Sequence, residues 1–282
     1  MHSQPAAPNV DEKTVEGFGR EWAAFDQTTL DPDEHRRLFS AYFSCFPLDA
    51  LSPAAEGFDL GCGSGRWAAL LAPKVGVLHC IDPAPPALEV ARQRLAGEPG
   101  VRFHLATADD IPLPDGSQDF GYSLGVLHHV PDTAAALYKC TAKLKPGAPF
   151  LLYLYYRFDN RPVWYAWLWR TTDLARRVVS RLPFPLRRGV TTAIAAGVYF
   201  PLARTAKTLE RVGRNVSNLP LSAYRDASFY TMRTDALDRF GTRLEQRFTK
   251  EEMRALMESA GLERIVFRES EPFWVACGYR RA

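Results

Sequence analysis

Cysteines are scarce in this chain, and none of them is paired in the sequence. The 282 residues include five, at Cys45, Cys62, Cys80, Cys140 and Cys277. No two form a C-x-x-C pair, and several lie in segments that we expect to be buried strands. This pattern argues against a disulfide framework or a zinc site and predicts the reduced thiols of a cytoplasmic protein.

Long apolar runs are missing as well. No run approaches the ~20 residues that a membrane-spanning helix needs. The first residues, Met1 to Lys13, are polar and include prolines, so they lack the apolar centre of a signal peptide. No internal repeat or long low-complexity segment is present. A hydrophobic content of 46% in 282 residues predicts one large α/β domain, or a domain with a cap.

Charge is balanced overall but unevenly distributed. The formal net charge is +3, yet the segment 157–214 holds twelve basic residues and only three acids. That segment therefore carries an excess of nine positive charges, and the rest of the chain carries an excess of six negative ones. A strongly basic segment thus interrupts an acidic chain.

A glycine-rich turn between a strand and a helix is the most informative motif. Gly61, Gly63 and Gly65 follow an apolar stretch that contains Asp59. Glycines let the backbone turn sharply and let a ligand approach a helix N-terminus. The dinucleotide fingerprint is G-x-G-x-x-G, whereas this motif is G-x-G-x-G. A preceding acid suits a cofactor with a cationic end better than a pyrophosphate, although a glycine-rich turn alone can arise by chance.

Apolar runs that end in acids predict further parallel strands. Val75 to Asp82 is such a run, and a carboxylate at a strand end can accept hydrogen bonds from both ribose hydroxyls. An ordinary turn acid is the alternative. Val101 to Leu105 alternates and leads to Asp109, and the stretch from Asp119 to Val130 reads as a fourth strand with its exit loop.

The remaining elements complete a sheet. Phe150 to Tyr156 predicts a fifth strand, and a capping box at 249–252 predicts a helix that ends at Gly261. Two final strands are expected at 262–268 and 273–279. These patterns predict an α/β fold with a doubly wound, mostly parallel seven-stranded sheet and a helical cap inserted after strand 5.

Taken in order, these motifs resemble those of the class I S-adenosylmethionine-dependent methyltransferases, in the small-molecule branch with the type 11 domain. The resemblance covers roughly residues 55–156 and the C-terminal end. It implies a Rossmann-like methyltransferase fold that binds S-adenosyl-L-methionine. The cofactor-binding residues that it implies are Asp59, Gly61, Gly63, Gly65, Arg66, Asp82, Asp109, Gly125 and Trp22. No metal is expected.

Two of these expectations concern particular ends of the cofactor. The resemblance implies that Asp109 hydrogen-bonds the adenine amino group. Trp22 belongs to an N-terminal segment that would form a lid and shield the sulfonium, with Arg20 or Arg66 meeting the carboxylate. The alternative is a helix that merely covers the sheet.

His128 and His129 are the candidate catalytic residues. They follow the fourth strand, and histidine titrates in the range that suits removal of a proton from the acceptor. One of the pair often packs structurally in this branch. A metal site formed with Asp132 is not expected, because no further ligands cluster nearby.

The chain divides into four predicted parts: N-terminal lid helices at 1–54, the cofactor-binding core at 55–156, a basic and aromatic helical cap at 157–247, and a C-terminal completion of the sheet at 248–282. The segment 157–214 mixes Trp and Arg. It predicts either amphipathic helices on an anionic membrane surface or a cap whose arginines face water. No nucleic-acid partner is expected. Substrate contacts are expected at 221–235.

The function expected is transfer of a methyl group to an O, N or C atom of a small molecule or lipid-linked metabolite, by a cytoplasmic or membrane-peripheral enzyme. Two alternatives remain. A nicotinamide-dependent oxidoreductase disagrees with the glycine spacing and Asp59, and a non-catalytic partner protein disagrees with the intact Asp59, Asp82 and Asp109.

Overall fold

The centre of the protein is a seven-stranded sheet with the strand order β3-β2-β1-β4-β5-β7-β6. The structure is a computed structural model that describes residues 8–282, so part of the polar start predicted at 1–13 lies outside the described residues. The first five strands are parallel, and β7 runs antiparallel between β5 and β6. This arrangement confirms the predicted fold class. The strands are β1 (Glu56–Leu60), β2 (Val77–Asp82), β3 (Val101–Leu105), β4 (Phe120–Leu124), β5 (Pro149–Tyr153), β6 (Leu262–Phe267) and β7 (Val275–Arg280).

Helices cover both faces of the sheet, because the central strands are apolar on both sides. On one face, α5 (Thr133–Ala142) and α10 (Lys250–Ser259) pack against a cluster that includes Phe58 and Phe150. On the other face lie α2 (Pro32–Tyr42), α3 (Ala68–Leu71) and α4 (Pro85–Arg94). The predicted capping box is present at the start of α10, where Thr249 and Glu252 cap each other.

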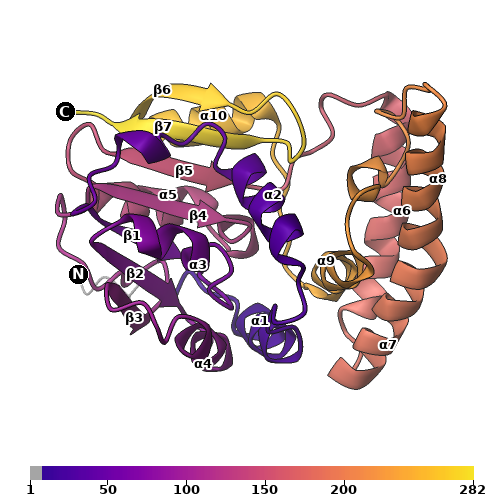
Figure 1. The fold of residues 1–282 in the computed structure, drawn as a ribbon, viewed down its shortest axis with the longest axis horizontal. Helices are drawn as coiled ribbons and strands as arrows, with labels where there is room; N and C mark the ends of the chain where they lie inside the picture. Colours follow the sequence, from indigo (N-terminus) through magenta and orange to yellow (C-terminus); the bar gives the residue numbers. More distant parts are fainter. Residues whose placement is uncertain (1–7) are drawn as a thin grey trace, which may run out of the picture.

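The helical insertion follows β5 and forms a separate layer beside the sheet. It consists of α6 (Val163–Val179), α7 (Phe184–Ile194), a π-helical turn (Ala195–Tyr199), α8 (Phe200–Arg211) and α9 (Phe229–Gly241). Figure 1 shows α6, α7 and α8 on the side away from the sheet, with α9 between them and α1 (Glu12–Ala24). The insertion has its own core, which includes Tyr199, Met232 and Phe240. Among residues 8–282, no helix is long and apolar enough to cross a membrane.

The two ends of the insertion meet at one point. The fifth strand is shorter than predicted, because β5 ends at Tyr153 and the chain then leaves the sheet. Tyr156 forms an isolated parallel bridge with Phe248, where the chain returns. The Phe248 N–H donates to the Tyr155 carbonyl at 2.9 Å, and the Arg157 N–H donates to the Phe248 carbonyl at 2.9 Å. Tyr155 and Tyr156 are therefore fixed beside the sheet edge.

Several arginines of the basic segment face inward, which neither prediction for the cap anticipated. The Arg176 side chain is 7% exposed and pairs with Asp173 at 2.8 Å. Its guanidinium also donates to the carbonyls of Thr242 and Arg243, beyond α9. Arg187 donates to the Gly241 carbonyl in the same way. Part of the positive charge therefore holds the insertion together.

Candidate functional site

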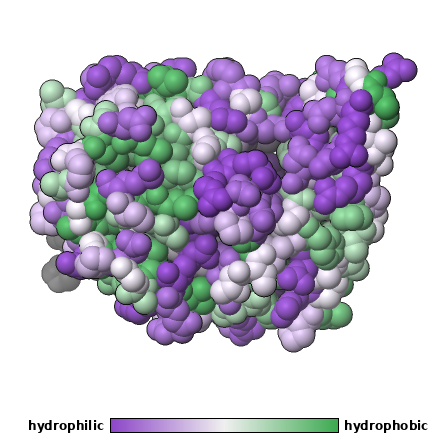
Figure 2. Space-filling model, viewed as in Figure 1, coloured by the Kyte–Doolittle hydropathy of each residue, from purple (hydrophilic) through white to green (hydrophobic). Residues whose placement is uncertain are grey.

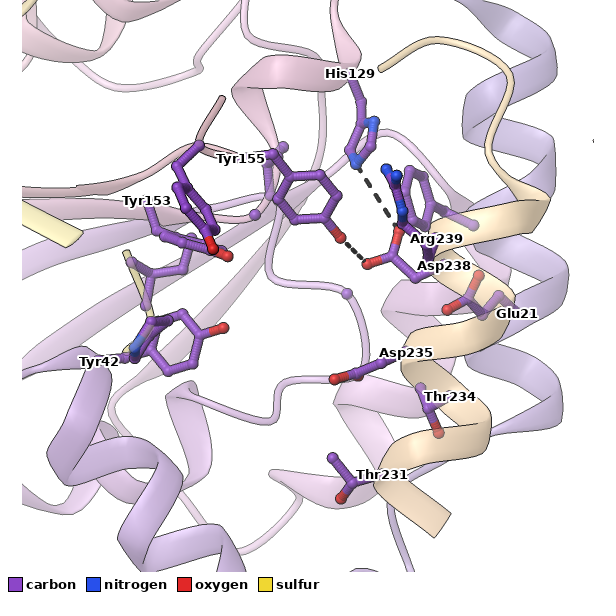
Figure 3. Close-up of a pocket in the computed structure, with 18 of the residues that line it drawn as sticks. Glu21, Tyr42, His129, Tyr153, Tyr155, Thr231, Thr234, Asp235, Asp238 and Arg239 are labelled. Carbon is purple, nitrogen blue, oxygen red and sulfur yellow. Dashed lines mark hydrogen bonds and ion pairs between the residues drawn. The ribbon is translucent and has the colours of Figure 1, made fainter. Parts of the chain in front are cut away.

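A large cavity lies where the carboxyl ends of the parallel strands meet the N-terminal helices and the insertion. Its volume is about 1100 Å³, and its lining is mostly apolar. Figure 2 shows that hydrophilic residues gather in the middle of the drawn face, where the sheet domain adjoins the insertion. Figure 3 shows the side chains that meet inside the cavity. Open α/β sheets bind ligands at this edge.

The glycine loop after β1 forms the first part of the wall. Gly61 and Gly63 have positive φ angles of 77° and 53°, which disfavour any other residue. A Cβ on Gly63 would lie 2.9 Å from Trp22 Nε1, and one on Gly61 would lie 2.3 Å from a Val126 methyl. Gly65 instead packs against Leu95 next to α4 and does not line the cavity. The loop is thus held between α1 and the exit of β4.

Asp82, at the end of β2, fixes the glycine loop by accepting backbone hydrogen bonds. One carboxylate oxygen accepts from the Gly63 N–H at 2.9 Å, and the other accepts from the Ala84 N–H at 2.8 Å. Burial raises the pKa of Asp82 to about 6, although the two hydrogen bonds oppose this shift. A carboxylate has about four acceptor positions. Asp82 lines the cavity, and each of its oxygens keeps an acceptor position beyond the one backbone hydrogen bond that it accepts.

The other two predicted acids lie behind the lining. Asp59 is 1% exposed, and burial raises its pKa to about 8. Asp109 accepts from the Asn9 N–H at 2.6 Å, and the Asn9 side chain also bonds the backbone of Asp132. Asp109 therefore fastens the N-terminal segment over the strand ends, while its neighbours Thr107 and Ala108 line the cavity. Direct cofactor contacts of Asp59 and Asp109 stay predictions.

Trp22, Arg66 and Gly125 all line the cavity. Trp22 comes from α1 and lies against Gly63. The Arg66 guanidinium stacks over the Trp67 ring, with 4.1 Å between its central carbon and the ring centroid. These groups, with Asp82 and the glycine loop, fit a cofactor that has a ribose, a sulfonium and a carboxylate.

The two neighbouring histidines have different environments. His129 lines the cavity, and its Nδ1 lies 2.6 Å from the Leu244 carbonyl oxygen, so Nδ1 carries the proton in the neutral ring. Its Nε2 faces Asp238 Oδ1 at 3.9 Å (Figure 3). Burial lowers the pKa of His129 to about 4.

His128 is fully buried behind the lining. Its ring lies between those of His129 and Tyr155, with both centroid distances at 3.9 Å. Burial and the nearby His129 hold its pKa well below the usual range. His128 packs beneath the cavity wall, and its catalytic role stays a prediction.

The carboxylates that line the cavity include Glu21 on α1, and Asp235 and Asp238 on α9. Asp235 lies in the range predicted for substrate contacts, whereas Glu21 and Asp238 were not predicted. The Tyr155 hydroxyl donates to Asp238. The prediction placed substrate contacts at 221–235 without recognising a helix from 229 to 241. The i, i+3, i+4, i+7 spacing of Thr231, Thr234, Asp235 and Asp238 is the signal that reveals one polar helix face.

A buried ion-pair network supports this part of the wall. Glu245 is 1% exposed in its side chain and pairs with Arg239 at 2.6 Å and with Arg247 at 2.7 Å. The Arg247 guanidinium also lies 5.1 Å from the Tyr155 ring centroid. Among residues 8–282, no group of three or more His, Cys, Asp and Glu side chains is arranged to hold a metal ion.

Comparisons with known proteins agree with this geometry. The family model described as a methyltransferase domain matches residues 58–152. An uncharacterized methyltransferase of Mycobacterium bovis, Mb0092, is 31% identical over 134 residues, which cover 46% of this chain and 68% of that protein. The chain belongs to the S-adenosylmethionine-dependent methyltransferases.

Two further methyltransferases show how far the likeness extends. The malonyl-[acyl-carrier protein] O-methyltransferase of Serratia marcescens is 30% identical over 141 residues, and the chain spans about half of its length, 51%. The solved S-adenosylmethionine-dependent methyltransferase of Methanosarcina mazei has a TM-score of 0.50 at 19% identity. That match covers 84% of this chain and 98% of that one and shows a shared fold. The family match ends at 152, before the insertion.

Proposed function

We propose that the protein transfers a methyl group from S-adenosylmethionine to an O, N or C atom of a small molecule or lipid-linked metabolite held in the cavity. The observation that carries this proposal is the position of Asp82 and Gly63 on the wall of a cavity of about 1100 Å³. Pockets for one small ligand measure ~300–1,000 Å³. The volume therefore suits a cofactor together with an acceptor.

The cofactor supplies an electrophilic methyl group on a sulfonium. The chain positions it: Asp82 accepts the ribose hydroxyls, Gly63 lets the backbone approach, and Trp22 closes the side toward α1. The insertion covers the acceptor and keeps water out. Alignment of this kind supplies up to ~7–11 kcal/mol in the best cases.

Asp238 is the group placed to take a proton from the acceptor. Burial raises its pKa to about 6, while the hydrogen bond from Tyr155 opposes the shift. It is therefore ionised at neutral pH and more basic than an exposed carboxylate. His129 faces the second oxygen, and its unprotonated Nε2 orients toward the same space. The Tyr155 hydroxyl thus positions Asp238, whereas Nε2 of His129 donates no hydrogen bond to it and stays open to accept one.

Calorimetry with S-adenosylhomocysteine tests the cofactor site. Asp82→Ala removes a charged acceptor for two hydroxyls, so we expect binding to weaken by roughly 1.5–3 kcal/mol. Asp115→Ala is the matched control, because that carboxylate is exposed and pairs with Lys143 outside the cavity. NAD and NADP should bind far more weakly than S-adenosylhomocysteine. Unchanged binding by Asp82→Ala, or tighter binding of a nicotinamide dinucleotide, would contradict the proposal.

A further inference from the structure

The wall formed by α1 and α9 carries more negative charge than it can balance. Glu21, Asp235 and Asp238 all line the cavity, and the charge of Arg66 lowers the pKa of all three. Burial raises the pKa of each, Asp235 and Asp238 also raise the pKa of Glu21, and Asp238 raises that of Asp235. Like charges that approach each other in a poorly solvated site are costly unless a cation joins them.

The other cations near this wall already have partners. Arg239 and Arg247 pair with Glu245. Arg187 acts on Glu21, but its guanidinium donates to the carbonyls of Gly241 and Leu182. These arginines hold the insertion and do not neutralise the three carboxylates one for one.

Glu21 supplies an independent sign that something is bound here. Its side chain is 4% exposed, yet its Oε1 has no hydrogen-bond partner among the described residues, although it lines the cavity. The Nε2 of His129, also buried, lacks a hydrogen-bond donor in the same part of the chain. A buried acceptor without a donor costs about 1–3 kcal/mol. A ligand that donates hydrogen bonds would satisfy both atoms.

Aromatic rings stand opposite the carboxylates. Figure 3 shows Tyr42, Tyr153 and Tyr155 on one side of the space and Asp235, Asp238 and Glu21 on the other. Faces of aromatic rings attract cations, and the attraction grows when water is excluded. A site with carboxylates on one side and rings on the other is suited to an ammonium group.

We propose that the methyl acceptor is an amine, held as its ammonium ion between the carboxylates of Glu21, Asp235 and Asp238 and the tyrosine rings. This inference rests on the proposed function. The apolar part of the amine would lie along the rest of the cavity wall. Even with the single net positive charge that the cofactor brings, negative charge remains on this wall for the amine to balance.

The reaction at this site is balanced without any further reagent. The ammonium ion passes one proton to the Asp238 carboxylate. The freed nitrogen lone pair forms the bond to the methyl carbon, and the bonding pair of the carbon–sulfur bond goes to sulfur, which leaves as a neutral thioether. The product is a methylated ammonium ion, and the proton on Asp238 is released to water.

A neutral, hydroxyl-rich acceptor is the competing ligand, because carboxylates and aromatic rings also bind sugars. Charge separates the two. A neutral acceptor would leave three carboxylates facing Arg66, whereas an ammonium ion would offset part of that repulsion.

The test uses the full chain saturated with S-adenosylhomocysteine and two probes of the same shape, 2-phenylethylamine and 2-phenylethanol. We expect the amine to bind at least tenfold more tightly than the alcohol. Asp235→Asn should weaken amine binding about tenfold and leave alcohol binding unchanged, because it removes only charge. Asp115→Asn is the matched control and should change neither affinity.

Each outcome bears on one claim. Equal affinity for the two probes, amine binding that Asp235→Asn does not change, or no measurable amine binding at millimolar concentration would overturn the inference. Retained binding of S-adenosylhomocysteine in those cases leaves the proposed function standing. If the unmodified protein does not bind S-adenosylhomocysteine, the proposed function is instead overturned.

Discussion

The cavity has two walls that are built in different ways. The wall at the sheet edge is mainly backbone: glycines, two N–H groups and one carboxylate that they hold. The wall from α1 and the insertion is mainly side chains, with unbalanced carboxylates and rings held by arginines. A backbone wall suits a constant ligand, whereas a side-chain wall can be altered by substitution. We therefore expect the sheet-edge wall to bind mainly the cofactor and the other wall to bind mainly the acceptor.

The same contrast runs through the arginines of the insertion. Arg176 and Arg177 are adjacent on α6, yet the first is buried and the second is 64% exposed in its side chain. The first holds the segment that follows α9, whereas the second lies at the outer surface and bonds only the other oxygen of Asp173. The sequence alone does not show which of these two arginines is buried.

The largest expected effect is the difference in the free energy of unfolding between variants at these two arginines. Arg176→Met leaves Asp173 and the carbonyls of Thr242 and Arg243 without their buried partner. We expect the free energy of unfolding to fall by about 3 kcal/mol or more. Arg177→Met, the matched control, should change it by less than about 1 kcal/mol. Urea unfolding measures both, and equal losses would show that Arg176 does not anchor the insertion.

The sheet-edge wall should respond to pH at one carboxylate. Asp82 has a pKa of about 6, so it is ionised above that pH and protonated below it. Its ability to accept two hydroxyls is lost as pH falls, and S-adenosylhomocysteine should bind about tenfold more weakly at pH 5 than at pH 8, since each unit below the pKa is a factor of ten. The Asp82→Ala variant should show no such decline. An equally steep decline in that variant would assign the pH effect to another group.

The outer surface of the insertion gives the smallest expected effect. Val163, Trp167, Leu174 and Val178 are each more than 60% exposed along α6, beside exposed Arg177. We expect the protein to sediment with anionic vesicles more than with neutral ones, and less so as salt is added. Arg177→Glu together with Trp167→Ala should reduce this binding several-fold, since one basic residue contributes about 1 kcal/mol.

That design leaves Arg176 and Arg187 in place, because they hold the fold. Tyr138→Ala on α5 is the control, as its ring is also exposed but lies on another helix. Equal sedimentation with both vesicle types would leave a solvated outer surface.

Features that depend on short stretches of chain could be predicted from the sequence. The strands, the glycine loop and the capping box at Thr249 are local patterns, and each was found, although β5 ends three residues before its predicted end. The carboxylate cluster was missed because Glu21 and Asp238 are distant in the sequence and meet only when α9 packs beside α1. His128 and His129 could not be told apart, since their roles depend on which side of one 3₁₀ turn faces the cavity.

The bridge between Tyr156 and Phe248 brings the two ends of the insertion together. Because the insertion leaves and rejoins the sheet at one point, evolution can lengthen, shorten or exchange it without moving a strand. We therefore expect exchange of this segment to alter the part of the acceptor wall that α9 supplies, while the glycine loop and Asp82 stay in place. A chimera that carries a relative's segment between these two residues is therefore a direct route to a new acceptor on the same sheet.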